Sequence, residues 1–482
     1  MNILSVSSEV APFSRTGGMG DVCGALPRAL AARGNRVVTV SPRYGREHDH
    51  LAWDTGVTFT FWLFGSWHEV RYTLHEAEPG LAHILVENPH FERPGIYGDD
   101  SGAYGDNLMR FALLCRAALE VPRRVPVFGA LLGDDITVHA HDWHASLALV
   151  YLSALYKPLG IYSGARGVLN VHNAAHHGRY AASEYGGLDL SPRHLSALAD
   201  DGNLSCLKAG IVCASDVVAV SPTFAQELTT PAGGFGMDAY LRARANAGRL
   251  HGVLNGVDID EWNPETDPHL PAHFSLADLS GKAECKAALQ RELGLPVRAD
   301  VPLVGMVARL DYQKGVDLLA GVGDWIARQD MQLVVLGTGS AKLAGALQHM
   351  QAHLPDKVRA CIAFDTALSH RIFAASDLTL VPSRFEPCGL TQMYGMRYGA
   401  VPVVRSTGGL VDTVDIWNPA DGTGVGWRFS EASTRGLLDA LGWALLTWWK
   451  HPEAFARIRA NGMSRDFSWS NAAARYEQIY QG

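Results

Sequence analysis

Short apolar runs alternate with longer amphipathic stretches along most of the chain. Residues 1–10 read MNILSVSSEV, a β-type run, and the helix-like pattern that follows ends at Gly34. Glycine just past an amphipathic stretch is a common helix stop. NRVVTVSP, residues 35–42, then reads as a second strand. This alternation predicts a parallel α/β sheet.

The pattern changes between residues 53 and 86. VTFTFWLF (57–64) and HEVRYTLHEAE (68–78) alternate apolar and polar positions, and Gly65 lies between them. These features predict a hairpin-rich insertion. The α/β pattern resumes in three further runs: ITVHAHDWH (136–144), GVLNVHN (167–173) and DVVAVSP (216–222).

A second α/β series starts near residue 300, with five strand-like runs: VPLVGMVARL (301–310), MQLVVLGTG (331–339), VRACIAF (358–364), DLTLVPS (377–383) and VPVVRS (401–406). Continuous apolar strands between helices indicate parallel sheets covered on both faces. Residues 263–299, rich in proline, read as a surface connection with one helix. We therefore predict two doubly wound, Rossmann-like domains with a boundary at residues 253/254 and a hinge near 254–264.

Two such domains place a cleft between the carboxyl ends of two parallel sheets, where open α/β folds bind ligands. The loops after the strands should therefore carry the chemistry.

Composition narrows the function classes. The chain has 482 residues, 47% hydrophobic and 19% charged, and its net charge of −8 argues against a nucleic-acid partner. The seven cysteines show no CxxC pair, which favours reduced thiols in a cytoplasmic protein. No basic stretch precedes Arg15 and no apolar run is long enough to span a membrane, so we expect neither a signal peptide nor a membrane partner.

The loop after the first strand reads SRTGGMGDV (14–22). Its glycines let the backbone approach a ligand, the following helix offers its N-terminal amides, and Arg15 adds a cation. The spacing matches neither GxGxxG nor a Walker A loop. A phosphate or sugar site and a tight turn without a ligand both remain open.

Two loops of the second domain carry charge. ARLDYQKG (308–315) follows a strand and holds Arg309 and Lys314, two cations able to bind a diphosphate without a metal. PSRFEPCGLTQ (382–392) places Glu386 just before a helix expected to begin near Gly389, where a carboxylate can accept from sugar hydroxyls. STGGLVDTV (406–414) repeats the arrangement of glycines before a helix N-terminus. Solvated surface charge is the alternative for Arg309 and Lys314.

HAHDWH (139–144) suggests a metal site. Three histidines and an aspartate end a strand, but the hydrolase spacing HxHxDH is not met and no second ligand group has suitable spacing. His172, after the next strand, would face the same cleft as Asp142. Trp53, Trp62 and Trp67 could stack on sugar rings, although strand spacing favours core and hairpin packing.

Taken together and in order, these motifs resemble glycosyltransferase family 5, the bacterial glycogen synthases and plant starch synthases. The resemblance rests on TGGMGDV, HDWH, VHN, LKAGI, VSPTFAQE, LNGVD, ARLDYQKG, PSRFEPCGLTQ and STGGLVDTV, and it spans nearly the whole chain. It implies the two-Rossmann GT-B fold, with residues 254–461 as the nucleotide-sugar domain and a helix within 462–482 crossing back to the acceptor-side domain 1–253.

The resemblance further implies retaining transfer of glucose from ADP-glucose to an α-1,4-glucan such as glycogen, without a metal or another cofactor. Domain closure would exclude water. The implied catalytic residues are Glu386, His172, Arg309, Lys314 and Asp142. The implied substrate-binding residues are Arg15, Gly17, Gly18, Asp21, Asn173, Asn255, Cys388, Gly389, Leu390, Thr391, Gly408 and Gly409.

Two single residues and one short segment depart from the family pattern. Arg15 replaces a usual lysine, Met19 a common leucine, and AAHHG with His176 and His177 stands where the family has an aromatic-containing stretch. Nothing in the residues themselves distinguishes ADP- from UDP-glucose. A metal-dependent hydrolase built on HAHDWH and a glucan-binding protein without activity are the rival interpretations.

Overall fold

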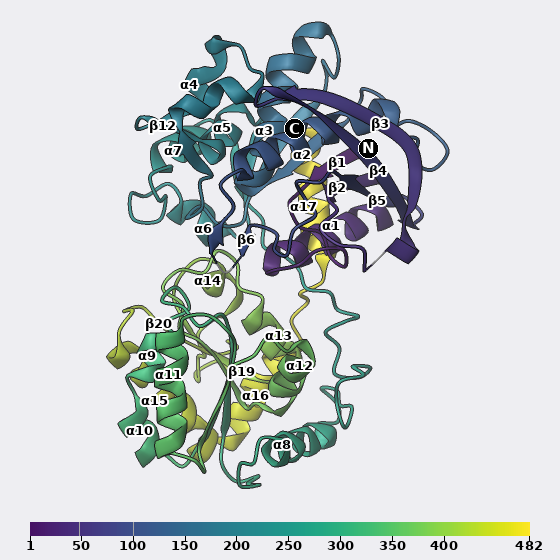
Figure 1. Cartoon of the computed structure of the whole chain (residues 1–482). Helices are drawn as coiled ribbons and strands as arrows, with labels where there is room; N and C mark the ends of the chain where they lie inside the picture. The colour runs from purple at the N-terminus through teal and green to yellow at the C-terminus, as the bar shows by residue number, and fades with distance from the viewer. Residues whose placement is uncertain (48, 100) are drawn as a thin grey trace. The chain divides into compact units, whose positions relative to one another are not determined.

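The computed structural model describes residues 1–47, 49–99 and 101–482, which form two compact units (Figure 1). The first unit comprises Met1–Gly256 and Trp469–Gly482, and the second comprises Val257–Ser468. Residues 254–256 thus belong to the first unit and residues 462–468 to the second, a few residues beyond the limits predicted from the sequence.

The first unit is built on a nine-stranded sheet in the order β14-β13-β9-β8-β1-β2-β5-β4-β3. All neighbours from β14 to β5 pair in parallel, and β4 and β3 continue antiparallel. The strands are β1 (Asn2–Val6), β2 (Arg36–Pro42), β3 (Trp53–Leu63), β4 (Ser66–Glu78), β5 (Leu81–Glu87), β8 (Thr137–His141), β9 (Arg166–Val171), β13 (Asp216–Ala219) and β14 (Leu250–Gly252).

The predicted hairpin is present as β3 and β4, whereas strands β5 and β14 were not predicted from the sequence. Because β5 pairs in parallel with β2, the hairpin extends the main sheet. The remaining strands of this unit are short: β6 (Gly98–Asp99), β7 (Gly102–Ala103), β10 (Arg179–Ala181), β11 (Ala199–Asp200) and β12 (Asn203–Ser205).

The α-helices of the first unit are α1 (Gly18–Ala32), α2 (Asn107–Arg124), α3 (Asp142–Tyr151), α4 (Leu195–Leu198), α5 (Cys206–Cys213), α6 (Pro222–Glu227), α7 (Asp238–Asn246) and α17 (Trp469–Gln481). Helix α17, yellow in Figure 1, packs in one apolar cluster with α1. Leu26 and Leu30 of α1 and Tyr476 and Ile479 of α17 are buried in it. The last residues of the chain therefore contribute to the core of the first unit.

The second unit holds a six-stranded parallel sheet in the order β17-β16-β15-β18-β19-β20. Its strands are β15 (Leu303–Val307), β16 (Gln332–Leu336), β17 (Val358–Cys361), β18 (Leu378–Val381), β19 (Val401–Arg405) and β20 (Trp427–Phe429). The five predicted runs correspond to β15 to β19, and β20 was not predicted.

Helices cover this sheet and connect its strands: α8 (Ser280–Glu292), α9 (Val316–Ala320), α10 (Gly323–Arg328), α11 (Ala341–His353), α12 (Thr366–Ala375), α13 (Thr391–Arg397), α14 (Gly409–Thr413), α15 (Thr434–Lys450) and α16 (Pro452–Met463). Helix α8 is the one helix predicted within residues 263–299. Its lysines Lys282 and Lys286 are buried, and Lys286 is paired with Asp377 at 2.8 Å.

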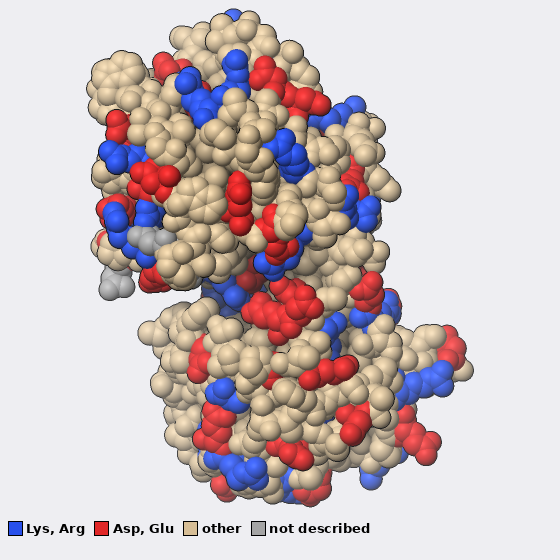
Figure 2. Space-filling model, turned by 90° about the vertical axis from the view of Figure 1, so that its right-hand side faces the viewer, with Lys and Arg blue, Asp and Glu red and all other residues tan. Residues whose placement is uncertain are grey.

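On the face seen in Figure 2, basic and acidic side chains are interspersed over each unit. All seven cysteines are free thiols, as expected from their irregular spacing. Among the described residues, no helix has the length and apolar character needed to cross a membrane.

Candidate active site

Glu9 organises the loop between β1 and α1. Its buried carboxylate accepts hydrogen bonds from the backbone N–H of Thr16 at 2.5 Å, from the Thr16 hydroxyl at 2.7 Å and from the Tyr97 hydroxyl. Glu9 was not among the site residues predicted from the sequence. The available signal was an acidic residue directly after a buried strand, where a charge requires partners.

Arg15 and Asp21, both predicted to bind substrate, form an ion pair with each other. The distance from Arg15 Nε to Asp21 Oδ1 is 2.9 Å, and both side chains are partly exposed. Gly17 precedes α1 in an extended conformation, and a Cβ atom added there would meet nothing within 4 Å. The loop therefore leaves open space beside Gly17, directly before the first turn of α1.

The Asp142 carboxylate binds the protein's own backbone. Its Oδ1 accepts from the backbone N–H of His172 at 2.7 Å and of Asn173 at 3.3 Å, and it adopts a left-handed φ of 54°. Burial raises the pKa of this carboxyl to about 7, against the opposing effect of the two backbone hydrogen bonds. Asp142, predicted to line the glucose side, thus fixes the loop that carries His172.

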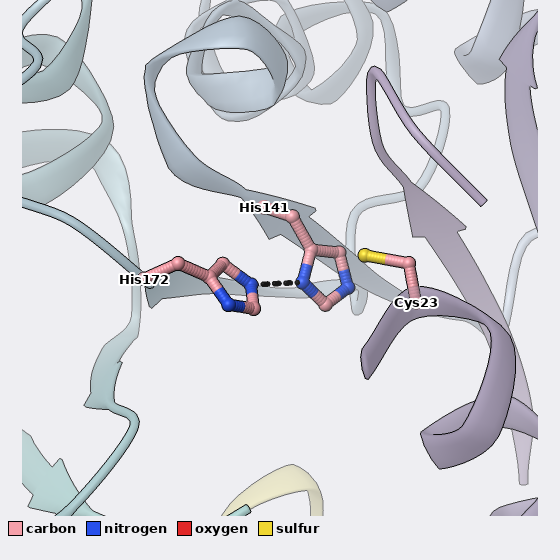
Figure 3. A group of neighbouring side chains, drawn as sticks. All are labelled: Cys23, His141 and His172. Carbon is pink, nitrogen blue, oxygen red and sulfur yellow. Dashed lines mark hydrogen bonds between the residues drawn. The ribbon is translucent and has the colours of Figure 1, made fainter. Parts of the chain in front are cut away.

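His172 contacts a second histidine at the neighbouring strand end (Figure 3). The His141 Nδ1 and His172 Nε2 atoms are 2.9 Å apart. Burial lowers the pKa of His172 to about 3 and that of His141 well below its usual range, so both imidazoles are neutral at pH 7. His141 pairs with Asn170 in the parallel register of β8 and β9, which places His172 beside it.

The HAHDWH histidines do not converge on one point. His139 and His141 lie two residues apart on one strand and so share a face, with ring centroids 4.2 Å apart, but the His139 Nδ1 atom bonds to the Tyr480 hydroxyl at 2.9 Å. His144 packs against Trp143 and Phe111. The metal ligands considered from the sequence are therefore directed to different partners.

A different trio has metal-ligand geometry: the ligand atoms of Cys23, His141 and His172 lie within 4.8 Å of one another (Figure 3). Burial raises the pKa of the Cys23 thiol well above its usual range, so the thiol is protonated at pH 7. The two nearest imidazole nitrogens are already joined by a hydrogen bond. Binding of a metal would have to displace both the thiol proton and this hydrogen bond.

Two asparagines of the first unit were predicted to bind substrate. Asn173 uses its Oδ1 locally, as acceptor for the Ala175 N–H at 3.0 Å. Asn255 is 5% exposed, and within the described residues its Oδ1 has no hydrogen-bond partner. His177, one of the residues that depart from the family pattern, accepts a hydrogen bond at its Nδ1 atom from Arg179 Nε at 3.2 Å. Of the two asparagines, only Asn255 has a buried acceptor still to be satisfied.

In the second unit, Lys314 and Glu386 form an ion pair. Lys314 Nζ lies 2.6 Å from Glu386 Oε2, and the same oxygen accepts from the Ser383 hydroxyl at 2.8 Å. Glu386 follows β18 and Lys314 follows β15, and these strands are neighbours in the sheet. The side chains of Lys314 and Glu386 are 21% and 9% exposed.

Arg309 does not join this pair. Its guanidinium bonds to Gln313 at 3.2 Å and pairs with Asp311 at 3.3 Å, and its side chain is 61% exposed. The solvated surface charge considered for this loop therefore describes Arg309 in the present structure, but not Lys314.

Gly408 and Gly409 pack against the chain's own backbone. A Cβ atom on Gly408, which has a φ of 44°, would lie 2.1 Å from the Glu386 carbonyl oxygen, and one on Gly409 would lie 2.0 Å from that of Cys388. The Gly409 N–H also donates to the Glu386 carbonyl at 3.1 Å. These glycines, predicted to face substrate, allow the STGG loop to hold the Glu386 loop.

Both expected helices are present, and α14 begins at Gly409, within the STGG loop. Helix α13 begins at Thr391, two residues after Gly389, and Leu390 is its N-cap. Helices α13 and α14 contain seven and five residues, so each has few aligned peptide dipoles. A pocket in this unit nevertheless includes Lys314, Glu386 and Thr391; its other lining residues are Met306, Val307, Ala308, Leu380, Val381, Pro382 and Ser383.

The tryptophans at positions 53, 62 and 67 are exposed, against the expectation of core packing. Trp62 and Trp67 are cross-strand partners in the β3–β4 hairpin, with ring centroids 5.4 Å apart and exposures of 45% and 69%. Hairpin packing is thus confirmed for this pair, and the sugar-stacking alternative stays a prediction.

Family models match segments in both units of the chain. Residues 2–243 match the family described as "Starch synthase catalytic domain", and residues 294–456 match "Glycosyl transferases group 1".

Similar curated proteins include soluble starch synthase 1 of Solanum tuberosum, 44% identical over 99% of this chain and 78% of the relative. Starch synthase 1 of Arabidopsis thaliana is 43% identical over 100% of this chain and 77% of the relative. Both are described as chloroplastic or amyloplastic.

Among solved structures, the catalytic domain of starch synthase IV from Arabidopsis thaliana, bound to ADP and acarbose, superposes with a TM-score of 0.89 at 34% identity. The match covers 99% of this chain and 98% of that one. A sucrose-phosphate synthase from Thermosynechococcus elongatus, at 19% identity and a TM-score of 0.61 over 100% and 98% of the two chains, shares the fold.

Proposed function

The chain belongs to the starch synthase family of glucan-synthesising glycosyltransferases with the GT-B fold, and we propose that it elongates α-1,4-glucan chains with glucose from ADP-glucose. The starch synthase IV structure contains ADP and acarbose, which supports a nucleotide-sugar donor and an oligosaccharide acceptor for this chain as well.

The Lys314–Glu386 pair is the observation that carries the proposal. An ammonium and a carboxylate, 72 residues apart in sequence, meet in a pocket at two neighbouring strand ends. The ammonium can bind the diphosphate and stabilise the charge that grows on it as it leaves. The carboxylate, held by Lys314 and Ser383, keeps lone pairs free to accept from glucose hydroxyls.

Arg309 supplies a second cation for the leaving ADP in this proposal. Its present partners, Asp311 and Gln313, lie in its own loop, and a mostly exposed side chain can turn toward a phosphate at low cost. The short segment from Cys388 to Thr391 would offer backbone amides to the same diphosphate.

The first unit supplies the residues around the transferred glucose and the acceptor. Open space beside Gly17 can admit a sugar next to the exposed Gly18, and Arg15 and Asp21 would contribute a cation and an acceptor beside it. His172 would donate to a glucose hydroxyl, with Asp142 and Asn173 fixing its loop.

The proposed reaction occurs on one face of the sugar. The acceptor 4-hydroxyl oxygen forms a bond to glucose C1 while the bond from C1 to the β-phosphate oxygen breaks. The departing phosphate oxygen takes the hydroxyl proton, so ADP leaves and the anomeric configuration is retained. Neither a metal nor another cofactor has a step in this scheme.

We further propose glycogen as the polymer and the cytoplasm as the location. Seven free thiols suit a reducing compartment.

An assay of ADP release, with glycogen as acceptor and ADP-, UDP- and GDP-glucose as alternative donors, tests the proposal. The highest kcat/KM is expected for ADP-glucose; a higher value for UDP-glucose would refute the donor assignment.

The rival functions have less support. A metal-dependent hydrolase built on HAHDWH would need converging ligands, whereas His139, His141 and His144 face different partners. An inactive glucan-binding protein would have no need for an ion pair between Lys314 and the buried Glu386.

A further inference from the structure

Two side chains outside the proposed substrate contacts are connected to His172. Asn170 Nδ2 donates to His172 Nε2 at 3.1 Å, and the Tyr476 hydroxyl donates to Asn170 Oδ1 at 3.0 Å. Asn170 and Tyr476 are fully buried. Tyr476 belongs to α17 and lies 306 residues after Asn170 in the sequence. The C-terminal helix is therefore connected to His172 through the side-chain amide of Asn170.

The second neighbour of His172 Nε2 is His141. Its Nδ1 lies 2.9 Å away, and the Ser5 hydroxyl lies 3.1 Å from its Nε2 (Figure 3 shows the histidine pair). Because both imidazoles are neutral, each carries one proton, and the hydrogen-bond partners decide which nitrogen holds it.

The two histidines and Ser5 alone would allow two proton arrangements. His141 Nδ1–H can donate to His172 Nε2 while Ser5 donates to His141 Nε2. In the reverse arrangement His172 Nε2–H donates to His141, and His141 Nε2–H donates to Ser5. Reversal satisfies the same contacts, so these three groups do not select between the two arrangements.

Asn170 breaks this symmetry. Its amide N–H points at His172 Nε2, which must then accept, and the imidazole proton therefore lies on Nδ1. The Tyr476 hydroxyl donates to the carbonyl oxygen of the same amide, and this hydrogen bond stabilises the amide in the observed direction. The Nδ1 atom of His172 does not face His141, and the residue is only partly buried (Figure 3).

We infer that Tyr476 and Asn170 are positioning residues that fix His172 as its Nδ1–H tautomer, so that the enzyme presents an N–H donor to the substrate. The inference rests on the proposed function only in assigning His172 to the glucose side. The proton arrangement itself is a property of the substrate-free protein.

The direct test is ¹⁵N NMR of histidine-labelled, substrate-free protein, with the His172 signals identified by their loss in H172N. The wild type should show Nδ1 protonated and Nε2 unprotonated. An Nε2–H tautomer in the wild type would overturn the inference without any variant of the positioning residues.

Y476F removes the hydroxyl and keeps the buried ring. Y480F is the matched control, because Tyr480 lies on the same helix, is also buried and bonds to His139. Y476F should populate the Nε2–H tautomer of His172 and lower kcat by roughly two- to tenfold, the value of one neutral hydrogen bond. Y480F should keep the wild-type tautomer and a kcat within about twofold of wild type.

A Y476F protein with the wild-type tautomer and the kcat of Y480F would contradict the positioning role. Failure of the proposed function would look different: the wild type would not transfer glucose, while the tautomer and its response to Y476F would remain as described.

Discussion

Lys314 donates a 2.6 Å hydrogen bond to Glu386, and the two residues come from loops after adjacent parallel strands, β15 and β18. Ser383 donates to the same carboxylate oxygen, and the Gly408–Gly409 turn packs on the backbone that carries Glu386. The carboxylate is therefore held in position before any substrate arrives, which is the condition for effective electrostatic stabilisation of a transition state.

Replacing Glu386 by glutamine should lower kcat about a hundredfold, equivalent to ~3 kcal/mol of transition-state stabilisation. The amide keeps the shape and can still accept from Ser383, so the fold should persist. Steady-state kinetics and a thermal melt of E386Q check both parts. A folded variant with near-normal kcat would remove Glu386 from the mechanism.

Activity should depend on the positive charge at position 15 more than on the shape of the side chain. R15K should retain most activity, and R15A should lose roughly ten- to a hundredfold in kcat/KM through loss of a charge-assisted hydrogen bond. Kinetics with donor and glycogen varied separately would show which substrate the cation serves.

D21N separates that role from the Arg15–Asp21 ion pair. Because the pair is partly exposed, its contribution to stability should be about 1 kcal/mol or less. If R15A and D21N behaved alike and both resembled wild type, Arg15 would serve only the turn. If lysine were as harmful as alanine, the planar guanidinium would be required.

The raised pKa of the Asp142 carboxyl should make the free energy of unfolding depend on pH. Burial raises its pKa to about 7 from an ordinary value near 3.8. Between these values the folded protein holds a proton that the unfolded chain has lost, so the free energy of unfolding should fall as pH rises, by at most ~1.4 kcal/mol per pH unit. Its contribution is fully present below about pH 4 and lost above about pH 7.

D142N is the matched variant, since asparagine accepts the same backbone hydrogen bonds and does not ionise. Denaturant unfolding at pH 5 and pH 8 should show a smaller decrease for D142N than for wild type. An equal decrease in both proteins would show that Asp142 does not titrate in this range.

Activity should survive EDTA, because Lys314 and Arg309 supply the charge that a metal ion would otherwise provide. The measurement is ADP release before and after chelation and dialysis. Loss of activity with EDTA followed by recovery with Zn²⁺ would revive a metal role, and the Cys23–His141–His172 trio would be the first place to mutate.

Much of the fold could be predicted because buried parallel strands have a distinctive apolar pattern, as for β15 to β19. Strand β5 was missed because its run, LAHILVE, was taken with the preceding hairpin. Short strands such as β20 carry too few residues to show a period.

The identities of many site residues could be predicted from the sequence, but most of the contacts between them could not. Glu386 and Lys314 were both named, but the sequence cannot show that residues 72 apart form an ion pair. Asp142 was named, although its carboxylate binds the backbone of the His172 loop. Glu9 and Tyr476 were missed because an acid after a strand and a tyrosine in a terminal helix have common structural roles.

Glucosyl transfer with retention of configuration can be read from the product itself. ADP-glucose labelled with ¹³C at C1 would be incubated with a short malto-oligosaccharide, and the products examined by NMR. Retaining transfer should give a labelled α-1,4-linked glucose at the non-reducing end, formed in step with ADP release. Labelled free glucose in place of a lengthened chain, a β-linked product, or no incorporation at all would contradict it.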